Sequence, residues 1–233
     1  MLELNHITNR YANELYLNDI HVTIEKGTLY GIAGTDREGK AALLRTIAGV
    51  SRPDIGEARL DGEPIYENPE AKKRIFFMSR TMYMRPWSML ADTARFYSGY
   101  YPNWSGDTFL QLADVFSLKT DQRTVTMTEE ELQLAKVAIG LSAGTDCLLM
   151  EKPFHDLDDE RIEMIIKLLH SYIEKREAIV ILTAKHIHEK NYTRYGYMED
   201  RMLLDNVTEA YYRSMEEKSK KEGKVYDLEH FFR

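Results

Sequence analysis

Cysteine, proline and long apolar runs are all scarce in this sequence of 233 residues. A single cysteine, Cys147, excludes a disulfide within the chain and is typical of a reducing compartment. No apolar run approaches the roughly 18 residues needed to cross a bilayer, and the first residues lack a signal-peptide pattern. Six prolines and 13 glycines, with no repeat, exclude collagen-like and low-complexity chains. We therefore expect a cytoplasmic protein without a membrane span of its own.

Positive charge is also in deficit. The 31 Lys and Arg residues against 38 Asp and Glu residues give a net charge of −7, which argues against a nucleic-acid binder. A hydrophobic share of 43% and a charged share of 30% are typical of a soluble globular protein. At roughly 150 residues per domain, the length allows one large domain or one domain with an inserted lobe.

Strand and helix patterns alternate on both sides of a purely helical middle. Alternating or short apolar runs predict strands over 2–8, 20–24, 29–33, 57–60, 75–78, 147–150 and 179–183. Apolar residues at three- and four-residue spacing predict helices over 41–48, 89–97, 108–116, 129–141 and 161–173. We expect one domain: an α/β core from 1–87 and 143–206, a helical lobe over 88–142, and a closing segment over 207–233.

A polar loop lies between the strand 29–33 and the first predicted helix. Its residues are Gly34, Thr35, Asp36, Arg37, Glu38, Gly39 and Lys40. The G-x-x-x-x-G-K spacing between a strand and a helix is typical of a phosphate-binding loop, whose backbone N–H groups face the phosphates. The next position, where a hydroxyl would bind Mg²⁺, holds Ala41, followed by Ala42. The alternative is an ordinary strand–turn–helix with glycines by chance.

Further segments, taken with this loop, are characteristic of one family. They are Tyr11, the turn from Gly49 to Gly56, the strand 75–80 that ends in Arg80, and the segments 127–131, 148–153, 157–158 and 179–185. With these segments the sequence resembles the ATP-binding subunit of an ABC transporter over nearly its whole length. The resemblance implies a P-loop ABC ATPase core of α/β class, with an antiparallel β subdomain and an inserted helical lobe. It also implies ATP as the ligand, with its adenine stacked on Tyr11, and Leu157 and Asp158 as the D-loop.

Most positions that carry the family's chemistry are replaced. Where the Walker B strand of a competent member ends in Asp and Glu, this chain has Glu151 and Lys152. Glu151 is the remaining candidate to bind a metal, whereas Lys152 cannot accept a proton while it is charged. The Q-loop glutamine is Arg80, and the switch histidine is Lys185, unless a shift of one residue restores His186. Because each lost contact typically slows catalysis ~100-fold or more, we expect absent or very weak hydrolysis and weakened Mg²⁺ binding.

The signature segment differs as much. It reads Met127, Thr128, Glu129, Glu130 and Glu131 where the family has Leu-Ser-Gly-Gly-Gln. A carboxylate ~4 Å from a triphosphate charge repels it by about 1–4 kcal/mol, depending on screening. The alternative, which we favour, is an ordinary helix start: Thr128 and Glu131 have the spacing of a capping box, and acidic residues suit a first helical turn.

Five cations would face the phosphates if the family geometry holds. They are Arg37, Lys40, Arg80, Lys152 and Lys185, opposed by Asp36 and Glu38. The extra lysines could replace the charge of the metal, so that nucleotide still binds. Alternatively Lys152 and Lys185 pair with Glu151 and neighbouring carboxylates and fill the site, which we favour slightly because buried charges need partners.

Two other features have alternative interpretations. His186, His188 and Glu189 could suggest a metal site, but no further ligand has a metal spacing, so solvated side chains are favoured. Methionine and aromatic residues over 82–90 could face a membrane subunit or could belong to the core of the helical lobe.

The favoured function is a degenerate ATP-binding subunit. Residues 101–104 and 228–231 are similar to those of export or resistance systems. The partners would be a competent paralogous ATP-binding subunit and membrane-spanning subunits, which would hold the chain on the inner face of the cell membrane. The alternatives are a pseudo-ATPase scaffold or regulator that binds no nucleotide and, ranked last, an active hydrolase with unusual residues.

Overall fold

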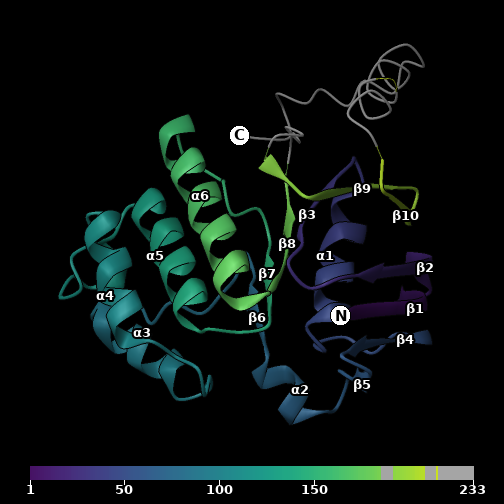
Figure 1. The fold of residues 1–233 in the computed structure, drawn as a ribbon, viewed down its shortest axis with the longest axis horizontal. Coiled ribbons are helices and arrows are strands. Elements are labelled where there is room, and N and C mark those ends of the chain that lie inside the picture. Colours follow the sequence, from purple (N-terminus) through teal and green to yellow (C-terminus); the bar gives the residue numbers. More distant parts are fainter. Residues whose placement is uncertain (185–190, 208–213, 215–233) are drawn as a thin grey trace.

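The computed structural model describes residues 1–184, 191–207 and 214, and its strands form two sheets (Figure 1). One sheet is antiparallel, in the order β2-β1-β4-β5. Its strands are β1 (Leu2–Tyr11), β2 (Glu14–Ile24), β4 (Ile55–Leu60) and β5 (Glu63–Pro64). This sheet is the antiparallel β subdomain that the sequence predicted.

The second sheet is mostly parallel and has the order β10-β9-β3-β8-β7-β6. Its strands are β3 (Leu29–Ala33), β6 (Ile75–Met78), β7 (Cys147–Met150), β8 (Ile179–Thr183), β9 (Arg194–Glu199) and β10 (Met202–Asp205). Only β10 runs antiparallel to its neighbour. The sequence predicted the four strands β3, β6, β7 and β8 with these bounds, and missed β9 and β10.

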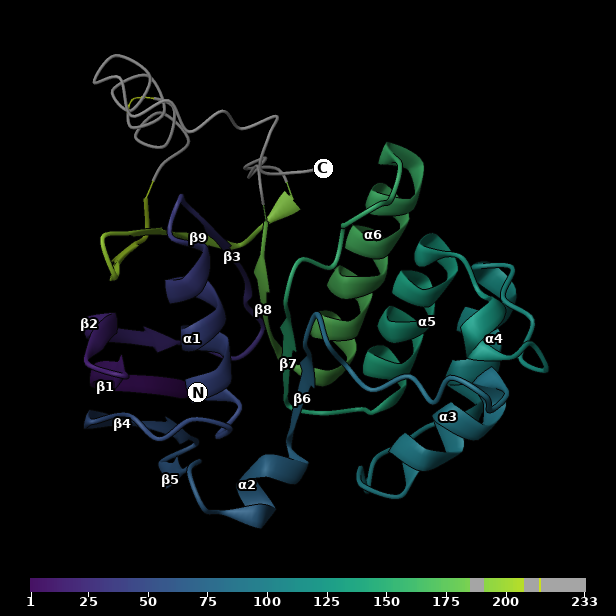
Figure 2. The same ribbon diagram turned by 180° about the vertical axis from the view of Figure 1, so that it is seen from behind.

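Helices cover both faces of the parallel sheet. They are α1 (Arg37–Ile47), α2 (Pro69–Lys73), α3 (Leu90–Ser98), α4 (Gly106–Val115), α5 (Glu129–Ser142) and α6 (Asp159–Arg176), with a 3₁₀ turn at Thr124–Thr126. Figures 1 and 2 show α1 and the antiparallel sheet on one side of the parallel sheet, and α5 and α6 on the other. The helices α3 and α4 lie beyond α5, farthest from α1.

The buried strands explain this layering. In β7 the side chains alternate: Cys147 and Leu149 pack in the core that contains α1, whereas Leu148 and Met150 pack in the core that contains α5 and α6. All four residues are fully buried. A parallel strand covered on both faces is apolar throughout, which is why such a short apolar run could be recognised in the sequence.

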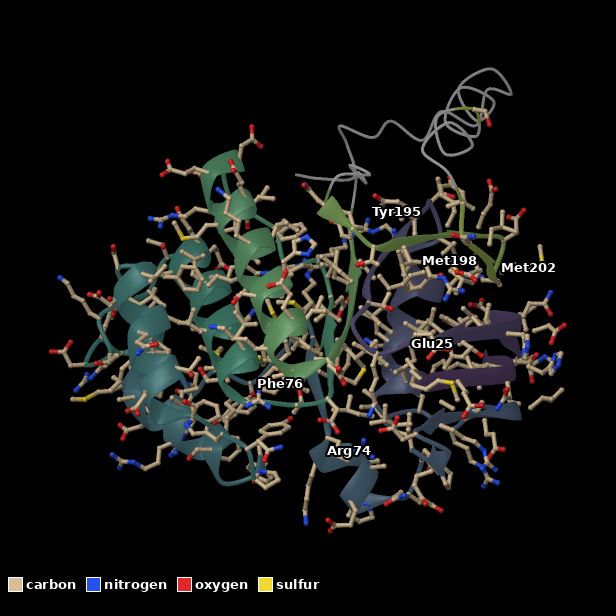
Figure 3. All side chains as sticks on the ribbon, viewed as in Figure 1. Glu25, Arg74, Phe76, Tyr195, Met198 and Met202 are labelled. Atoms are coloured by element: carbon tan, nitrogen blue, oxygen red, sulfur yellow. The ribbon has the colours of Figure 1, made fainter. Side chains whose placement is uncertain are left out.

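An aromatic cluster joins the helical lobe to the sheet. Phe76 of β6 lies with its ring centroid 5.9 Å from that of Tyr97 and 5.1 Å from that of Tyr101 (Figure 3). Tyr97 is also held by a hydrogen bond of 2.8 Å from its hydroxyl to the carbonyl oxygen of Tyr83. The lobe is therefore anchored on the strand that ends next to Arg80.

The stretch 82–90 divides between the two interpretations that the sequence allowed. Met82 and Leu90 are buried in the core of the lobe, whereas Tyr83, Trp87 and Met89 are 57%, 76% and 47% exposed. In the part of the chain that the structure describes, no helix is both long and apolar enough to cross a membrane. Residues 185–190 and most of the closing segment, 208–213 and 215–233, lie outside the described residues.

Candidate functional site

Three parallel strands end at the same edge of the sheet and bring the predicted site residues together. The loop 34–36 follows β3, and Glu151 and Lys152 follow β7. Arg80 lies two residues after the end of β6. In open α/β sheets ligands bind outside the carboxyl ends of the strands. The structure therefore places the phosphate loop, the Q-loop position and the Walker B position at the edge where a ligand site is expected.

The glycine at the start of the loop is required by the backbone. Gly34 has φ +116°, and a Cβ built there would lie 2.0 Å from the carbonyl oxygen of Met198 on β9. Figure 3 shows Met198 on that strand, in the layer that contains α1. Any side chain at this position would displace the loop, so this glycine is not there by chance.

The helix after the loop begins earlier than the sequence predicted. Asp36 is its N-cap, and Asp36 Oδ1 accepts a hydrogen bond of 2.8 Å from the backbone N–H of Gly39. The prediction of a helix start at Ala41 is wrong, because the polar first turn of α1 contains Arg37 and Glu38 and shows no apolar periodicity. The strand–loop–helix context of a phosphate loop is present.

Lys40 lies in the first turn of α1 and is almost fully buried. Its side chain is 7% exposed, and its Nζ donates a hydrogen bond of 2.6 Å to the carbonyl oxygen of Gly34. The pKa of Lys40 is lowered to about 8, mainly by burial and also by the nearby charge of Lys152 and, to a lesser extent, of Arg37, against the opposing charge of Asp36. A buried cation of this kind is stabilised by an anionic ligand.

The two carboxylates of the loop face a cation that the sequence analysis did not include. Arg201 lies in the turn between β9 and β10, and its guanidinium contacts Asp36 Oδ1 at 2.7 Å and Glu38 Oε2 at 3.3 Å. The backbone N–H of Arg201 also donates to Asp36 Oδ2 at 2.9 Å. The sequence gave no signal for this cation, because Asp36 and Glu38 are balanced within the loop by Arg37 and Lys40.

Tyr11 lies at the end of β1 and keeps an exposed ring. The ring is 74% exposed and contacts Tyr16 edge-to-face, with centroids 6.4 Å apart. The guanidinium of Arg201 lies over the ring of Tyr16, 5.3 Å from its centroid. Tyr11 is therefore linked through Tyr16 to the residue that contacts the phosphate loop, and its ring is available for stacking.

Glu151 and Lys152 form no ion pair with each other. Glu151 Oε2 instead accepts a hydrogen bond of 3.0 Å from the backbone N–H of Arg80. Among the described residues, no carboxylate oxygen lies within 4.0 Å of Lys152 Nζ, the distance that defines an ion pair. The expected pairing of Lys152 with Glu151 is wrong, because the Glu151 carboxylate is held by the backbone of the neighbouring strand end. Lys185 lies outside the described residues.

The backbone of Lys152 is fixed by its neighbours. Its N–H donates to Thr183 Oγ1 at 2.9 Å, and its carbonyl oxygen accepts from Gln133 Nε2 at 3.0 Å. Lys152 has φ +49°, a left-handed conformation that these two bonds hold in place. Burial lowers the pKa of its ammonium group, as do the charges of Arg37 and Arg80, against the opposing charge of Glu151. The site therefore gathers cations that have an electrostatic influence on one another.

The signature segment forms an ordinary, well-capped helix start. Thr128 is the N-cap of α5: Glu131 donates its N–H to Thr128 Oγ1 at 3.1 Å, and Thr128 donates its N–H to Glu131 Oε2 at 2.8 Å. Glu130 pairs with Arg161 of α6 at 3.4 Å, and Met127 is buried. The capping-box interpretation is confirmed.

The D-loop position has a similar capping role. Asp158 is the N-cap of α6 and accepts a hydrogen bond of 2.8 Å from the backbone N–H of Arg161. Leu157 is partly buried and packs against the core. The two residues follow Lys152 by five and six positions along the chain.

The residues at this edge do not fit a magnesium ion. Ala41 and Ala42 have no hydroxyl, and Lys152 is a cation. The remaining carboxylate of the Walker B position, Glu151, is hydrogen-bonded to the backbone of Arg80. Among the residues described, no three His, Cys, Asp or Glu side chains form a group that could hold a metal ion. Mg²⁺ prefers several oxygen ligands, and this donor set does not supply them.

Comparison with known proteins agrees with this geometry. A family model described as "ABC transporter" matches residues 17–155. The chain belongs to the ABC transporter family. It is similar to the ABC transporter ATP-binding protein YtrB of Bacillus subtilis, with 23% identity over 221 residues, which are 91% of this chain and 75% of the relative.

Another relative is much longer than this chain. A putative ribose/galactose/methyl galactoside import ATP-binding protein of Ralstonia nicotianae is 24% identical over 199 residues, which are 79% of this chain but only 38% of the relative. The chain therefore spans well under half the length of this relative.

Solved structures share the fold. An ATP-binding subunit of an ABC transporter matches with a TM-score of 0.81 at 16% identity, covering 92% of this chain and 93% of that chain. A dimeric ATP-binding cassette in a post-hydrolysis state, bound to ADP and Pi, matches with a TM-score of 0.76 at 19% identity, covering 89% of this chain and 100% of that chain. The fold is that of the ABC ATPases, as the sequence predicted.

Proposed function

We propose that this chain is a degenerate ATP-binding subunit of an ABC transporter, which binds nucleotide at the loop after β3 without hydrolysing it. One observation carries the proposal: Lys152 follows β7, at the edge of the sheet where the phosphate loop lies, and its charge influences Lys40 of that loop. An ammonium group at this position attracts phosphate. It is a poor acceptor for the proton of an attacking water, because a charged lysine has no free electron pair.

The buried Lys40 supports the binding half of the proposal. Lys40 is 7% exposed and has no ion pair among the described residues, so a phosphate would provide a counter-charge for an ammonium group that burial has removed from water. The exposed ring of Tyr11 would provide a surface for the base. Loss of hydrolysis follows from the electrostatics, since the site presents cations where the reaction needs an acceptor.

A second candidate function is a scaffold or regulator that binds no nucleotide. The observation that favours it is the position of the Asp36 carboxylate. It accepts a hydrogen bond from the N–H of Gly39 and forms an ion pair with Arg201. The N–H groups at the start of α1 are those that would bind phosphate. If Asp36 keeps this position, the loop holds an anion of its own and has less room for a ligand.

The partners follow from the family and from the surface. ATP-binding domains of ABC transporters pair with membrane subunits, and one of the structural neighbours is a dimer. The exposed Tyr83, Trp87 and Met89 support a contact with a membrane subunit. Such contacts would hold the chain on the inner face of the cell membrane, beside a competent paralogous subunit. Residues 101–104 support an export or resistance system, although relatives named for sugar import are also similar.

Binding and turnover by the purified full chain test this function. We expect calorimetry to detect ATP binding, and phosphate release to stay at background. Lys40→Ala should remove binding, whereas Lys167→Ala, at an exposed position on α6, should leave it unchanged. No binding by a folded chain would favour the scaffold function. Turnover of about 1 s⁻¹ or faster, abolished by Lys40→Ala, would refute the proposal.

A further inference from the structure

Two positions that contact the metal ion or the attacking water in a competent member of the family carry cations here, whereas Glu151 remains a carboxylate. Lys152 stands where the resemblance implies a glutamate, and Arg80 where it implies a glutamine. The arginine adds one positive charge, and the lysine adds one and removes a negative charge. One Mg²⁺ ion supplies two positive charges to the phosphates of a nucleotide. The side chains of Lys152 and Arg80 carry two positive charges, as many as the metal would bring, with the carboxylate of Glu151 between their backbones.

The hydrogen bonds of the sheet show that this charge lies beside the loop. Ile32 of β3 pairs with Thr183 of β8, and Ile32 is two residues before Gly34. The hydroxyl of Thr183 in turn accepts the N–H of Lys152, which fixes the backbone of Lys152 at the end of β8, the neighbour of the strand that leads into the loop. Arg80 is fixed on the other side of Lys152 by the bond from its N–H to Glu151.

We propose that this site binds the phosphates of a nucleoside triphosphate without Mg²⁺, with the ammonium group of Lys152 and the guanidinium of Arg80 in the place of the metal. This inference rests on the proposed function, because it concerns the same site. Its distinguishing feature is the order of affinity: the metal-free anion binds better than the magnesium complex. A bound Mg²⁺ would bring two positive charges among cations and would find no set of oxygen ligands.

Both a nucleotide and inorganic triphosphate carry the polyphosphate group that this site would bind. The exposed ring of Tyr11 favours the nucleotide, because a base stacked on an aromatic ring adds favourable binding free energy. The test therefore compares ATP with inorganic triphosphate, both in excess EDTA, and ATP in excess MgCl₂, by calorimetry on the full chain.

We expect ATP to bind in EDTA at least tenfold more tightly than in MgCl₂, and more tightly than inorganic triphosphate. Lys152→Gln should weaken binding in EDTA by about tenfold, which corresponds to ~1.4 kcal/mol. Lys167→Gln, an exposed lysine on α6, is the matched control and should change nothing. The unfolding temperature of each variant shows whether the chain is folded. Because the backbone bonds of Lys152 do not involve its side chain, we expect Lys152→Gln to fold.

The outcomes separate the two proposals. Binding of ATP in MgCl₂ but not in EDTA would overturn metal-free binding and leave the proposed function in place. No binding of ATP under either condition would overturn both, and would favour a scaffold. Equal affinity for ATP and inorganic triphosphate in EDTA would support the metal-free phosphate site and remove the role of Tyr11. An unchanged affinity in Lys152→Gln would refute the part given to Lys152.

Discussion

The contact between Arg201 and Asp36 should be a strong determinant of the stability of the phosphate loop. The Asp36 side chain is 8% exposed and that of Arg201 is 29% exposed, so the pair is largely removed from water. Arg201→Met keeps the length of the side chain and removes the charge. The carboxylate then keeps only its two backbone donors, the N–H groups of Gly39 and Arg201.

The magnitude follows from burial and from the contacts that remain. Breaking a fully buried pair costs about 3–5 kcal/mol, because one charge is left without a partner. Here Arg201 is partly exposed and Asp36 keeps two donors, so we expect Arg201→Met to lower the free energy of unfolding by ~2 kcal/mol. For a protein of this size, that corresponds to a fall of ~4–8 °C in Tm.

A double-mutant cycle isolates the pair. Asp36→Asn can still accept the N–H of Gly39 through Oδ1 but no longer carries a charge, and the double variant removes both charges. We expect a coupling free energy of ~1–2 kcal/mol in urea unfolding followed by circular dichroism. The matched control is Arg59→Met. Its partner is Glu57, and their side chains are 38% and 46% exposed, so its effect should stay within ~1 kcal/mol.

Additivity would refute this reasoning. If the effects of Arg201→Met and Asp36→Asn add to within ~0.3–0.5 kcal/mol, the two charges do not interact in solution. The turn between β9 and β10 would then not close over the phosphate loop. An effect of Arg59→Met as large as that of Arg201→Met would show that burial does not decide the strength of these pairs.

Three further predictions concern other parts of the site. A bound triphosphate should raise the pKa of Lys40 from about 8, so ATP affinity should be full below that pH and should fall as pH rises through it. Calorimetry at pH ~7 and ~9 tests this, and Lys40→Arg should lose the dependence. Thr128→Ala should lower the free energy of unfolding by ~1 kcal/mol through loss of the N-cap, and a urea midpoint unchanged from that of the parent would contradict this. ATP with Mg²⁺ should leave the oligomeric state unchanged in light scattering, since Glu129 and Glu130 would face the opposite triphosphate in a symmetric dimer, and ATP-driven dimerisation would show that they point elsewhere.

Four strands of the mostly parallel sheet, β3, β6, β7 and β8, were predictable from sequence because nearly all of their residues are buried. The antiparallel sheet was harder. The structure extends β1 to Tyr11 and starts β2 at Glu14, while the sequence pattern stopped at 8 and resumed at 20. These outer parts show no regular alternation: Leu15, Tyr16 and Leu17 follow one another, and the polar Asn9 is buried. Their turn, Ala12 and Asn13, has positive φ at both residues but contains no glycine to mark it.

The same reason explains why β9 and β10 were missed. The turn between them is Asp200 and Arg201, both with positive φ and neither a glycine. Missing these two strands also meant missing a residue of the site, because Arg201 is the cation that contacts the phosphate loop. It lies 165 residues from Asp36 along the chain. A partner so distant along the chain is found only when the sheet order is known.

The site positions were predictable because backbone geometry, and not side-chain chemistry, fixes them. Lys152 takes its place through its N–H and carbonyl oxygen, which are bound by Thr183 and Gln133. Gln133 lies on α5 and also donates to the carbonyl oxygen of Pro153 at 2.9 Å. None of these bonds uses the side chain at 152. The turn therefore does not depend on the side chain at this position, so a lysine fits there as a glutamate would. The substitution Lys152→Glu should then alter binding while leaving the structure intact.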